Sequence, residues 1–169
     1  MGDPVALRVL RKEGSEPMSV KMVDISGKEP VLREAEATGM IALRESTVSR
    51  IRAGTLEKGD VIAVAKVAAI QAVKRTPDFL PLCHPIPIEE VSVDFKVSDA
   101  SVSATVRVKA FAKTGVEMEA LSGVSAALLT VWDMAKKYEK DEMGQYPSTE
   151  VMSVRVLAKR KGEQQTPRG

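Results

Sequence analysis

Four short stretches of the sequence combine polar and charged residues in patterns that suggest chemistry. The first is Leu82-Cys83-His84, which lies inside a proline-rich segment and contains the single histidine of the chain. Prolines on both sides would hold His84 in one orientation, where an imidazole can contact a substrate or transfer a proton near neutral pH. The alternative is a histidine that caps a neighbouring element.

The second stretch runs from Lys113 to Glu119, where a predicted strand turns into a helix. Glu117 and Glu119 are two residues apart, so their side chains would point in different directions on a regular helix. At the entry turn, both could instead face a pocket. The alternative is that these acidic residues are there because carboxylates stabilise a helix N-terminus.

The third stretch, Trp132 to Lys137, lies near the end of the same predicted helix. Asp133 and Lys136 are three residues apart and therefore share a face of the helix, although lysines at a helix C-terminus are common. The apolar residues before Asp133 indicate a buried segment. We therefore expect a buried carboxylate, which needs a partner or has a shifted pKa.

The fourth stretch, Glu57-Lys58-Gly59-Asp60, is a charged turn before a helix whose N-terminus could receive a phosphate. The alternative is an ordinary helix cap. The sequence has no Walker-type phosphate loop and no GxSxG, HExxH or CxxC motif. The remaining lysines, carboxylates and histidine suit general acid–base catalysis on a phosphorylated substrate.

The first half of the chain must supply a strand and two helices to position these residues. Residues 31–43 fit a strand or a helix, and partial alternation of apolar and polar residues favours the strand. Residues 46–52 predict a short helix that ends near Gly54. Residues 59–75 predict a helix that is apolar nearly all round, which we expect to be well buried and to end at Thr76-Pro77.

The second half predicts a loop, a hairpin, a long helix and a last strand. Residues 79–88 contain three prolines and predict a rigid extended loop. Strict alternation over 90–97 and 101–112 predicts a hairpin with one buried face. Residues 115–138 predict the long helix and 152–158 the last strand. This order predicts an α+β fold, a ferredoxin-like split βαβ sandwich with an antiparallel sheet and an extra helix.

Composition narrows the function classes. The 169 residues suit one domain, which we expect over residues 21–161, with a flexible lead-in at 1–20 and a flexible tail at 162–169. A net charge of +2 is too even for a dedicated nucleic-acid surface. The single cysteine allows no intramolecular disulfide, and we expect no metal site and no cofactor. No apolar run approaches the roughly 20 residues of a membrane span, and we expect a cytoplasmic protein with no membrane partner.

Seven segments together resemble the molybdenum cofactor biosynthesis protein C family, the cyclic pyranopterin monophosphate synthases. They keep the family's order and spacing across roughly residues 22–161, and Leu80–Pro85 and Thr114–Leu121 are the most specific. The matching segments are Met22–Ser26, Lys58–Val61, Ala72–Thr76, Leu80–Pro85, Thr114–Leu121, Leu129–Met134 with Lys136, and Val154–Lys159.

The resemblance implies a phosphorus–oxygen lyase of molybdenum cofactor (molybdopterin) biosynthesis. Such an enzyme converts 3′,8-cyclo-7,8-dihydroguanosine 5′-triphosphate into cyclic pyranopterin monophosphate and releases pyrophosphate. Its substrate comes from the radical GTP cyclase of the pathway. Family members are homohexamers, trimers of dimers, with active sites at subunit interfaces.

The resemblance also implies roles for individual residues. Asp133 matches the family's active-site aspartate, and Lys58 and Lys136 match lysines that act in acid–base chemistry or stabilise charge. The segments Leu82, Cys83, His84 and Met118, Glu119 match substrate-binding positions, with Glu117 beside them. Further polar positions near the pocket are matched by Asp24, Lys74, Arg75 and Lys159.

Two other classes of function deserve comparison. A nucleic-acid-binding ferredoxin-like module would need stacking aromatics and a basic face on its sheet, but the central strands offer only Phe95 and Phe111. A regulatory domain that senses a small molecule without catalysis would be expected to lose Asp133 or Lys58, and both are present.

Overall fold

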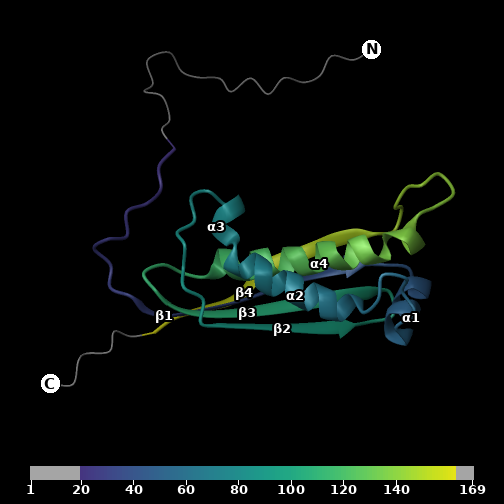
Figure 1. Ribbon diagram of the computed structural model, residues 1–169, viewed down its shortest axis with the longest axis horizontal. Coiled ribbons are helices and arrows are strands. Elements are labelled where there is room, and N and C mark those ends of the chain that lie inside the picture. Colours follow the sequence, from purple (N-terminus) through teal and green to yellow (C-terminus); the bar gives the residue numbers. More distant parts are fainter. Residues whose placement is uncertain (1–19, 163–169) are drawn as a thin grey trace, which may run out of the picture.

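A computed structural model describes residues 20–162 of the chain (Figure 1). Residues 1–19 of the predicted lead-in and 163–169 of the predicted tail lie outside these described residues. Gly162, the first residue of that tail, donates a backbone hydrogen bond to the carbonyl of Leu32 at 2.8 Å.

Four strands form one antiparallel sheet in the order β2-β3-β1-β4. Helical connections join β1 to β2 and β3 to β4, and each passes over one strand of the sheet, as in a split βαβ arrangement. The predicted α+β ferredoxin-like fold is confirmed. The elements in chain order are β1 (Val31–Ala42), α1 (Glu45–Ala53), α2 (Val61–Lys74), α3 (Thr76–Phe79), β2 (Glu90–Val97), β3 (Ser101–Ala112), α4 (Glu117–Glu139) and β4 (Glu150–Lys161).

Helices α2 and α4 lie side by side along one face of the sheet (Figure 1). The alternation of the strands explains this two-layer packing, because every second side chain of β1, β2 and β3 points at the helices. The inner face carries mostly Ala and Val, which let the helices approach closely. Gly123 of α4 shows how closely: a Cβ there would lie 2.8 Å from Val73 and 3.0 Å from Val106.

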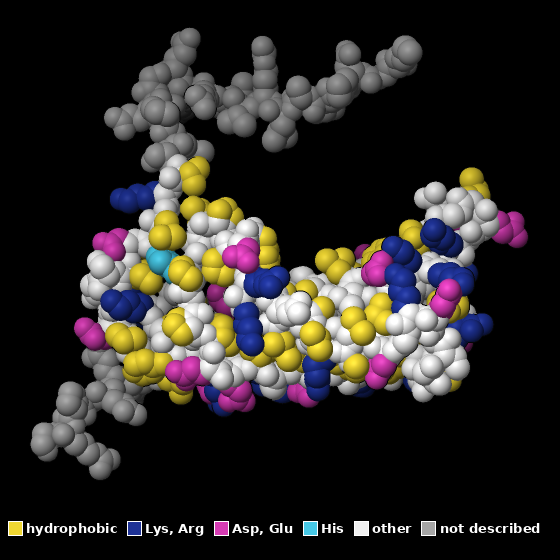
Figure 2. Space-filling model, in the orientation of Figure 1, with side chains coloured by type: hydrophobic (Ala, Val, Ile, Leu, Met, Phe, Trp, Pro, Cys, Tyr) yellow, Lys and Arg dark blue, Asp and Glu magenta, His cyan; other side chains and the backbone are white. Residues whose placement is uncertain are grey.

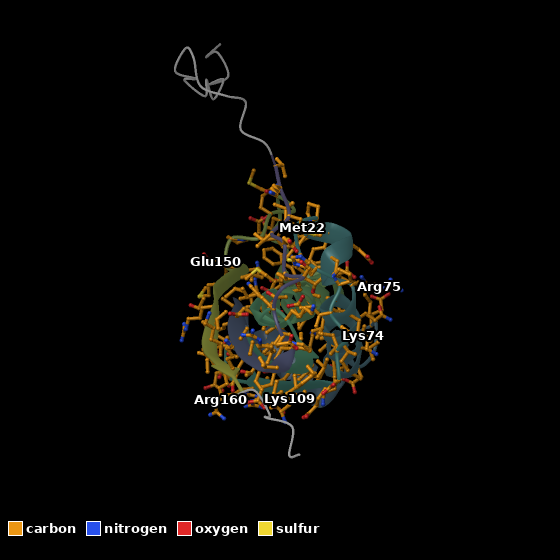
Figure 3. The ribbon with its side chains drawn as sticks, turned by 90° about the vertical axis from the view of Figure 1, so that its left-hand side faces the viewer. Met22, Lys74, Arg75, Lys109, Glu150 and Arg160 are labelled. Carbon is orange, nitrogen blue, oxygen red and sulfur yellow. The ribbon has the colours of Figure 1, made fainter. Side chains whose placement is uncertain are left out.

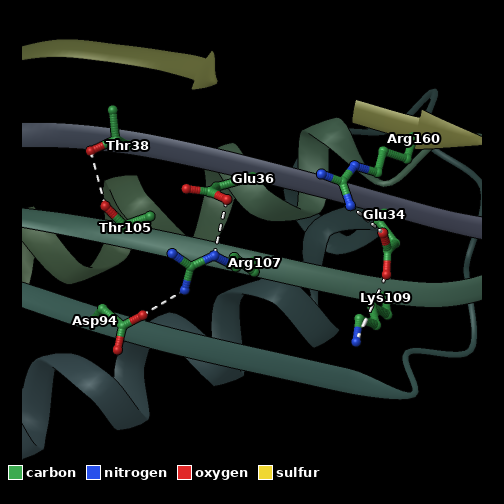
Figure 4. Close-up of polar contacts among 8 residues, drawn as sticks. All are labelled: Glu34, Glu36, Thr38, Asp94, Thr105, Arg107, Lys109 and Arg160. Atoms are coloured by element: carbon green, nitrogen blue, oxygen red, sulfur yellow. Dashed lines mark hydrogen bonds and ion pairs between the residues drawn. The ribbon is translucent and has the colours of Figure 1, made fainter. Parts of the chain in front are cut away.

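The other face of the sheet is open and covered by paired charges (Figure 4). Arg107 bonds Glu36 at 2.9 Å and Asp94 at 2.6 Å, and Lys109 bonds Glu90 at 2.9 Å. Phe95 instead packs against the core, and Phe111 is half exposed. Because Arg107 and Lys109 are paired with carboxylates and Phe111 is the exposed ring of β2 and β3, this face is poorly suited to stack and bind nucleic acid.

The strand prediction for residues 31–43 and the hairpin are confirmed, and α1 ends at Gly54, whose φ of 65° suits glycine. The helix predicted over residues 59–75 is present, but the prediction that it is well buried is wrong. Only Val61, Ala65, Ala69 and Val73 of α2 are buried, whereas Val64 and Val67 are about half exposed.

Two further details differ from the sequence prediction. After α2 the chain forms a second additional helix, the four-residue α3, in which Pro77 occupies the first turn. Strand β4 continues beyond Ala158 to Lys161 because it pairs with β1 as far as Arg33. Within the described residues, no helix is both long enough and apolar enough to cross a membrane.

Candidate active site

Asp133, Lys58 and Lys136 meet at the C-terminal half of α4 and form what we call the lysine–aspartate cluster. One carboxylate oxygen of Asp133 accepts a hydrogen bond from Lys58 Nζ at 2.6 Å, and the other pairs with Lys136 Nζ at 2.7 Å. Lys58 Nζ also donates to the backbone carbonyl of Asp133 at 3.1 Å. The three residues predicted to be catalytic are therefore brought together within one chain.

The cluster is open to solvent, and hydrogen bonds within it shift the pKa values of Asp133 and Lys136. The side chain of Asp133 is 55% exposed, so the expectation that it is buried is wrong. Hydrogen bonds from Lys136 and Lys58 lower the pKa of Asp133 to about 2, and the same carboxylate raises the pKa of Lys136. At neutral pH the cluster therefore presents an ionised carboxylate between ammonium groups, an arrangement suited to binding phosphate and stabilising developing negative charge.

A cavity of about 550 Å³ adjoins this cluster and adds further charges. Lys137 pairs with Glu57 at its rim, and Lys140 and Tyr138 also line it. Figure 2 shows Lys and Arg side chains gathered at this end of the molecule, near α1 and the end of α4.

The turn before α2 has the ordinary role of a cap. The side chain of Asp60 accepts a hydrogen bond from the backbone N–H of Ala63 at 3.0 Å. A carboxylate therefore occupies the helix N-terminus that could have received a phosphate. The contribution of this turn to the site is Lys58, through its side chain.

A larger cavity of about 810 Å³ lies where α4 begins, and we call it the Glu119 pocket. It contains seven of the residues predicted to bind substrate: Leu82, Cys83, His84, Glu117, Met118, Glu119 and Lys159. Apolar side chains from the segment before β1 and from the proline-rich loop complete its wall, among them Val23, Ile25 and Ile86. A flat ring with a few polar edge groups suits such a lining.

Both glutamates of the helix entry line this pocket, but their pKa values shift in opposite directions. Glu119 is buried, and its Oε2 has no hydrogen-bond partner among the described residues. Burial, with a smaller contribution from Glu117, raises the pKa of Glu119. Burial alone would also raise the pKa of Glu117, but a hydrogen bond from Lys159 at 2.9 Å and the surrounding charges lower it.

Of two further predicted site residues, Cys83 lines this pocket and Asp24 does not. Burial and the charge of Glu119 raise the pKa of Cys83, so the thiol stays protonated and is a poor nucleophile. Asp24 lies in the exposed segment before β1, where it accepts a hydrogen bond from the backbone N–H of Ser26 at 2.8 Å. Lys113 fixes this segment by donating to the carbonyl of Ser26 at 3.0 Å.

Lys74 and Arg75 are not brought into either cavity within this chain. Both side chains are exposed at the end of α2, on the side of the molecule away from Glu150 of β4 (Figure 3). Their predicted place beside the substrate remains a prediction.

Several residues around the two cavities were not predicted from the sequence. Lys28 and Ile25 line the Glu119 pocket. Ile25 belongs to the segment Met22–Ser26 that matches the family, but neither residue was named as part of a site. Tyr138 lines the other cavity and had no signal beyond being an aromatic residue in a helix. Among residues 20–162, no group of three or more His, Cys, Asp or Glu side chains is placed to hold a metal ion.

The two sets of residues stand at opposite ends of one helix. Glu119 and Asp133 are separated by about 21 Å along the axis of α4, at a rise of 1.5 Å per residue. The fold thus presents a cationic cluster at one end and a mostly apolar pocket with a buried carboxyl group at the other.

Comparison with known proteins identifies the family of the chain. Residues 22–162 match the MoaC family. A probable cyclic pyranopterin monophosphate synthase of Aeropyrum pernix is 62% identical over 141 residues, which cover 83% of this chain and 97% of the relative. Proteins described in the same words are 57% identical in Methanosarcina mazei, covering 85% and 91%, and 54% identical in Thermococcus kodakarensis, covering 86% and 93%. The chain belongs to the MoaC family.

Proposed function

We propose that this protein is a cyclic pyranopterin monophosphate synthase of molybdenum cofactor biosynthesis. It converts 3′,8-cyclo-7,8-dihydroguanosine 5′-triphosphate into cyclic pyranopterin monophosphate and pyrophosphate. The observation that carries the proposal is the lysine–aspartate cluster, in which Asp133 holds Lys58 and Lys136 as a pair of ammonium groups.

The cluster suits the phosphoryl part of this reaction. A substrate oxygen attacks the α-phosphorus, the bond between the α- and β-phosphates breaks, and pyrophosphate leaves. The ammonium groups of Lys58 and Lys136 would neutralise the triphosphate and the charge that develops on the leaving group. The raised pKa of Lys136 keeps it protonated, so its role is to donate a hydrogen bond or a proton.

The Glu119 pocket suits the heterocyclic part. Opening of the purine ring and closure of the pterin ring require several proton transfers, and the guanine-derived edge carries N–H donors. The buried carboxyl group of Glu119, with its unpartnered oxygen, would accept hydrogen bonds from that edge, while His84 and Glu117 exchange protons. The surrounding apolar side chains would hold the ring and exclude water.

The two sets of residues lie in separate cavities of a single chain, roughly 21 Å apart along α4. A site composed of the Glu119 pocket of one copy and the lysine–aspartate cluster of another would bring the two sets together. The separation supports a homo-oligomer with active sites between subunits. From the family resemblance we expect this oligomer to be a hexamer. The half-exposed Val64 and Val67 of α2 and Leu129 of α4 offer apolar surface for such contacts.

Two wider proposals accompany this function. The substrate would be supplied by a radical cyclisation of GTP, catalysed by a separate enzyme. Because that precursor is a cellular nucleotide, the expected compartment is the cytoplasm.

Incubation with freshly made cyclised dihydro-GTP tests the proposal. The wild-type protein should release pyrophosphate and form a pterin that becomes fluorescent on oxidation, and Lys136→Ala should form neither. A folded wild-type protein that binds the nucleotide and releases no pyrophosphate would overturn the enzymatic function in favour of a sensing domain.

A further inference from the structure

Lys58 is the one member of the lysine–aspartate cluster that does not belong to a helix. Asp133 and Lys136 share α4, whose backbone sets their spacing, but Lys58 lies in the connection between α1 and α2. A side chain on a connection holds its position only where the backbone around it is fixed. The contacts around residue 58 show which groups fix it.

Tyr138 makes two contacts with the α1–α2 segment from the last turns of α4. Its hydroxyl oxygen accepts a hydrogen bond from the backbone N–H of Glu57, the residue before Lys58, at 3.1 Å. Its ring lies 4.9 Å from the guanidinium carbon of Arg50 in α1, within range of a cation–π contact. One half-buried side chain of α4 therefore contacts both the helix and the connection that lead to Lys58.

The neighbours of Tyr138 hold the same segment at other points. The buried carboxylate of Glu139 accepts hydrogen bonds from the backbone N–H of Arg44 at 3.1 and 3.2 Å, and one from the hydroxyl of Thr149 at 2.6 Å. The bonds from Arg44 fix the start of α1, far from Lys58 in the sequence. The pair between Lys137 and Glu57 is closer, but both side chains are about two-thirds exposed, so solvent weakens it.

We propose that Tyr138 is a positioning residue that places Lys58 against Asp133 by holding the backbone of Glu57. This role rests on the proposed function of the cluster, since Tyr138 acts on the reaction through Lys58. Asp60 secures the other side of Lys58 by capping α2. The backbone next to Lys58 is thus held by Tyr138 of α4 on one side and by the cap of α2 on the other, and loss of the first leaves only the solvent-exposed pair of Glu57 with Lys137 on that side.

The test compares Tyr138→Phe, which removes one hydroxyl group and keeps the ring, with Ser125→Ala. Ser125→Ala also removes one hydroxyl group from α4. In the wild type that hydroxyl donates a hydrogen bond to the carbonyl of Leu121 within the same helix. Each protein is treated with an amine-reactive reagent at neutral pH, and the labelling rate of every lysine is measured by peptide mass spectrometry. Thermal unfolding confirms that both variants are folded.

In Tyr138→Phe, Lys58 should label about fivefold faster than in the wild type, the factor that corresponds to losing one ordinary hydrogen bond. Lys136 should label at the wild-type rate, because its pairing with Asp133 depends on α4 alone. The kcat of Tyr138→Phe should fall by a similar factor, with little change in KM. Ser125→Ala should change neither labelling nor kcat.

An unchanged labelling rate for Lys58 in Tyr138→Phe would overturn the inference, as would equal increases at Lys58 and Lys136. The labelling result decides the role of Tyr138 without reference to turnover. A wild-type protein that forms no pterin would instead overturn the proposed function, so the two failures are distinguishable.

Discussion

At the scale of single residues, Asp133 matters through the two ammonium groups it holds. Asp133→Asn keeps the shape of the side chain and removes its charge, leaving Lys58 and Lys136 without a shared anion. We expect kcat/KM to fall by about 10²- to 10⁴-fold, the usual range for losing a group engaged in acid–base or charge stabilisation. Pyrophosphate release measures this, with Asp99→Asn, which breaks the exposed pair with Arg52, as the control.

The charge state of Asp133 adds a second expectation. With its pKa lowered to about 2, Asp133 stays ionised at any pH at which the enzyme is assayed. A loss of wild-type activity on acidification between about pH 6 and pH 4 should therefore come from another group. An apparent pKa in that interval that NMR assigns to the Asp133 carboxyl group would contradict this expectation.

Glu119 should make the stability of the folded protein depend on pH. Because burial raises its pKa, the folded protein binds this proton more tightly than the unfolded chain does, and stability falls as the pH rises above 4.5, its ordinary value. Glu119→Gln should therefore raise Tm at pH 8, by roughly 2–4 °C for each kcal/mol of relieved ionisation, and the gain should shrink toward pH 4. Activity should drop. An equal gain in the exposed Glu150→Gln would rule out this explanation.

At the scale of elements, the tight contact between α2, α4 and the sheet depends on Gly123. Alanine at this position would gain about 1 kcal/mol of helix propensity, but its Cβ would meet Val73 at 2.8 Å and Val106 at 3.0 Å. Overpacking of a filled core costs about 1–3 kcal/mol, so we expect Gly123→Ala to lower Tm. In Gly27→Ala, where no atom lies within 4 Å of the new Cβ, Tm should stay within a degree or two.

The same scale shows how far the sequence could predict the fold. Strict alternation identified β2 and β3 because one face of each packs on the helices and the other is open. In β1 the signal was weaker, since its inner face consists of small residues such as Ala35, Ala37 and Gly39. In the sequence of α2, an apolar residue on the outer face cannot be distinguished from an apolar residue in the core. Periodicity cannot say which face another surface covers, so the exposure of Val64 and Val67 was missed.

The candidate site, like the fold, could be predicted only in part from the sequence. Its residue types and their family matches could be read from the sequence, and the contacts of Asp133 with Lys58 and Lys136 agree with them. Burial of Asp133 was predicted wrongly, because Leu129 before it is 60% exposed and that stretch of α4 is not fully covered. The role of Tyr138 depends on a contact across 81 residues of sequence, which no local pattern reveals.

At the scale of the whole molecule, the separation of the two sets of residues gives a test by mixing. Lys58→Ala keeps an intact Glu119 pocket, and Glu119→Gln keeps an intact lysine–aspartate cluster. If each active site takes one set from each of two copies, subunit exchange should restore about one quarter of wild-type activity, because half of the pockets and half of the clusters are intact.

The control is a mixture of Lys58→Ala with Asp133→Asn. These two residues contact one another within a single chain, so every subunit of this mixture carries a defective cluster whichever copy it pairs with. This mixture should stay inactive. Recovery there, or none in the first mixture after exchange is demonstrated by native mass spectrometry, would exclude a site shared in this way.

Helix α4 carries both sets of residues without interruption, so the number of residues between them sets their distance and relative orientation. One residue inserted between Glu119 and Asp133 would move the two ends apart by about 1.5 Å and rotate one against the other by about 100°. Substitutions along the outer face of α4 can leave that spacing intact, whereas no single insertion or deletion can. Over evolutionary time, the length of this segment should therefore be more constrained than its composition, and changes in chain length should accumulate in the 140–149 connection that follows it.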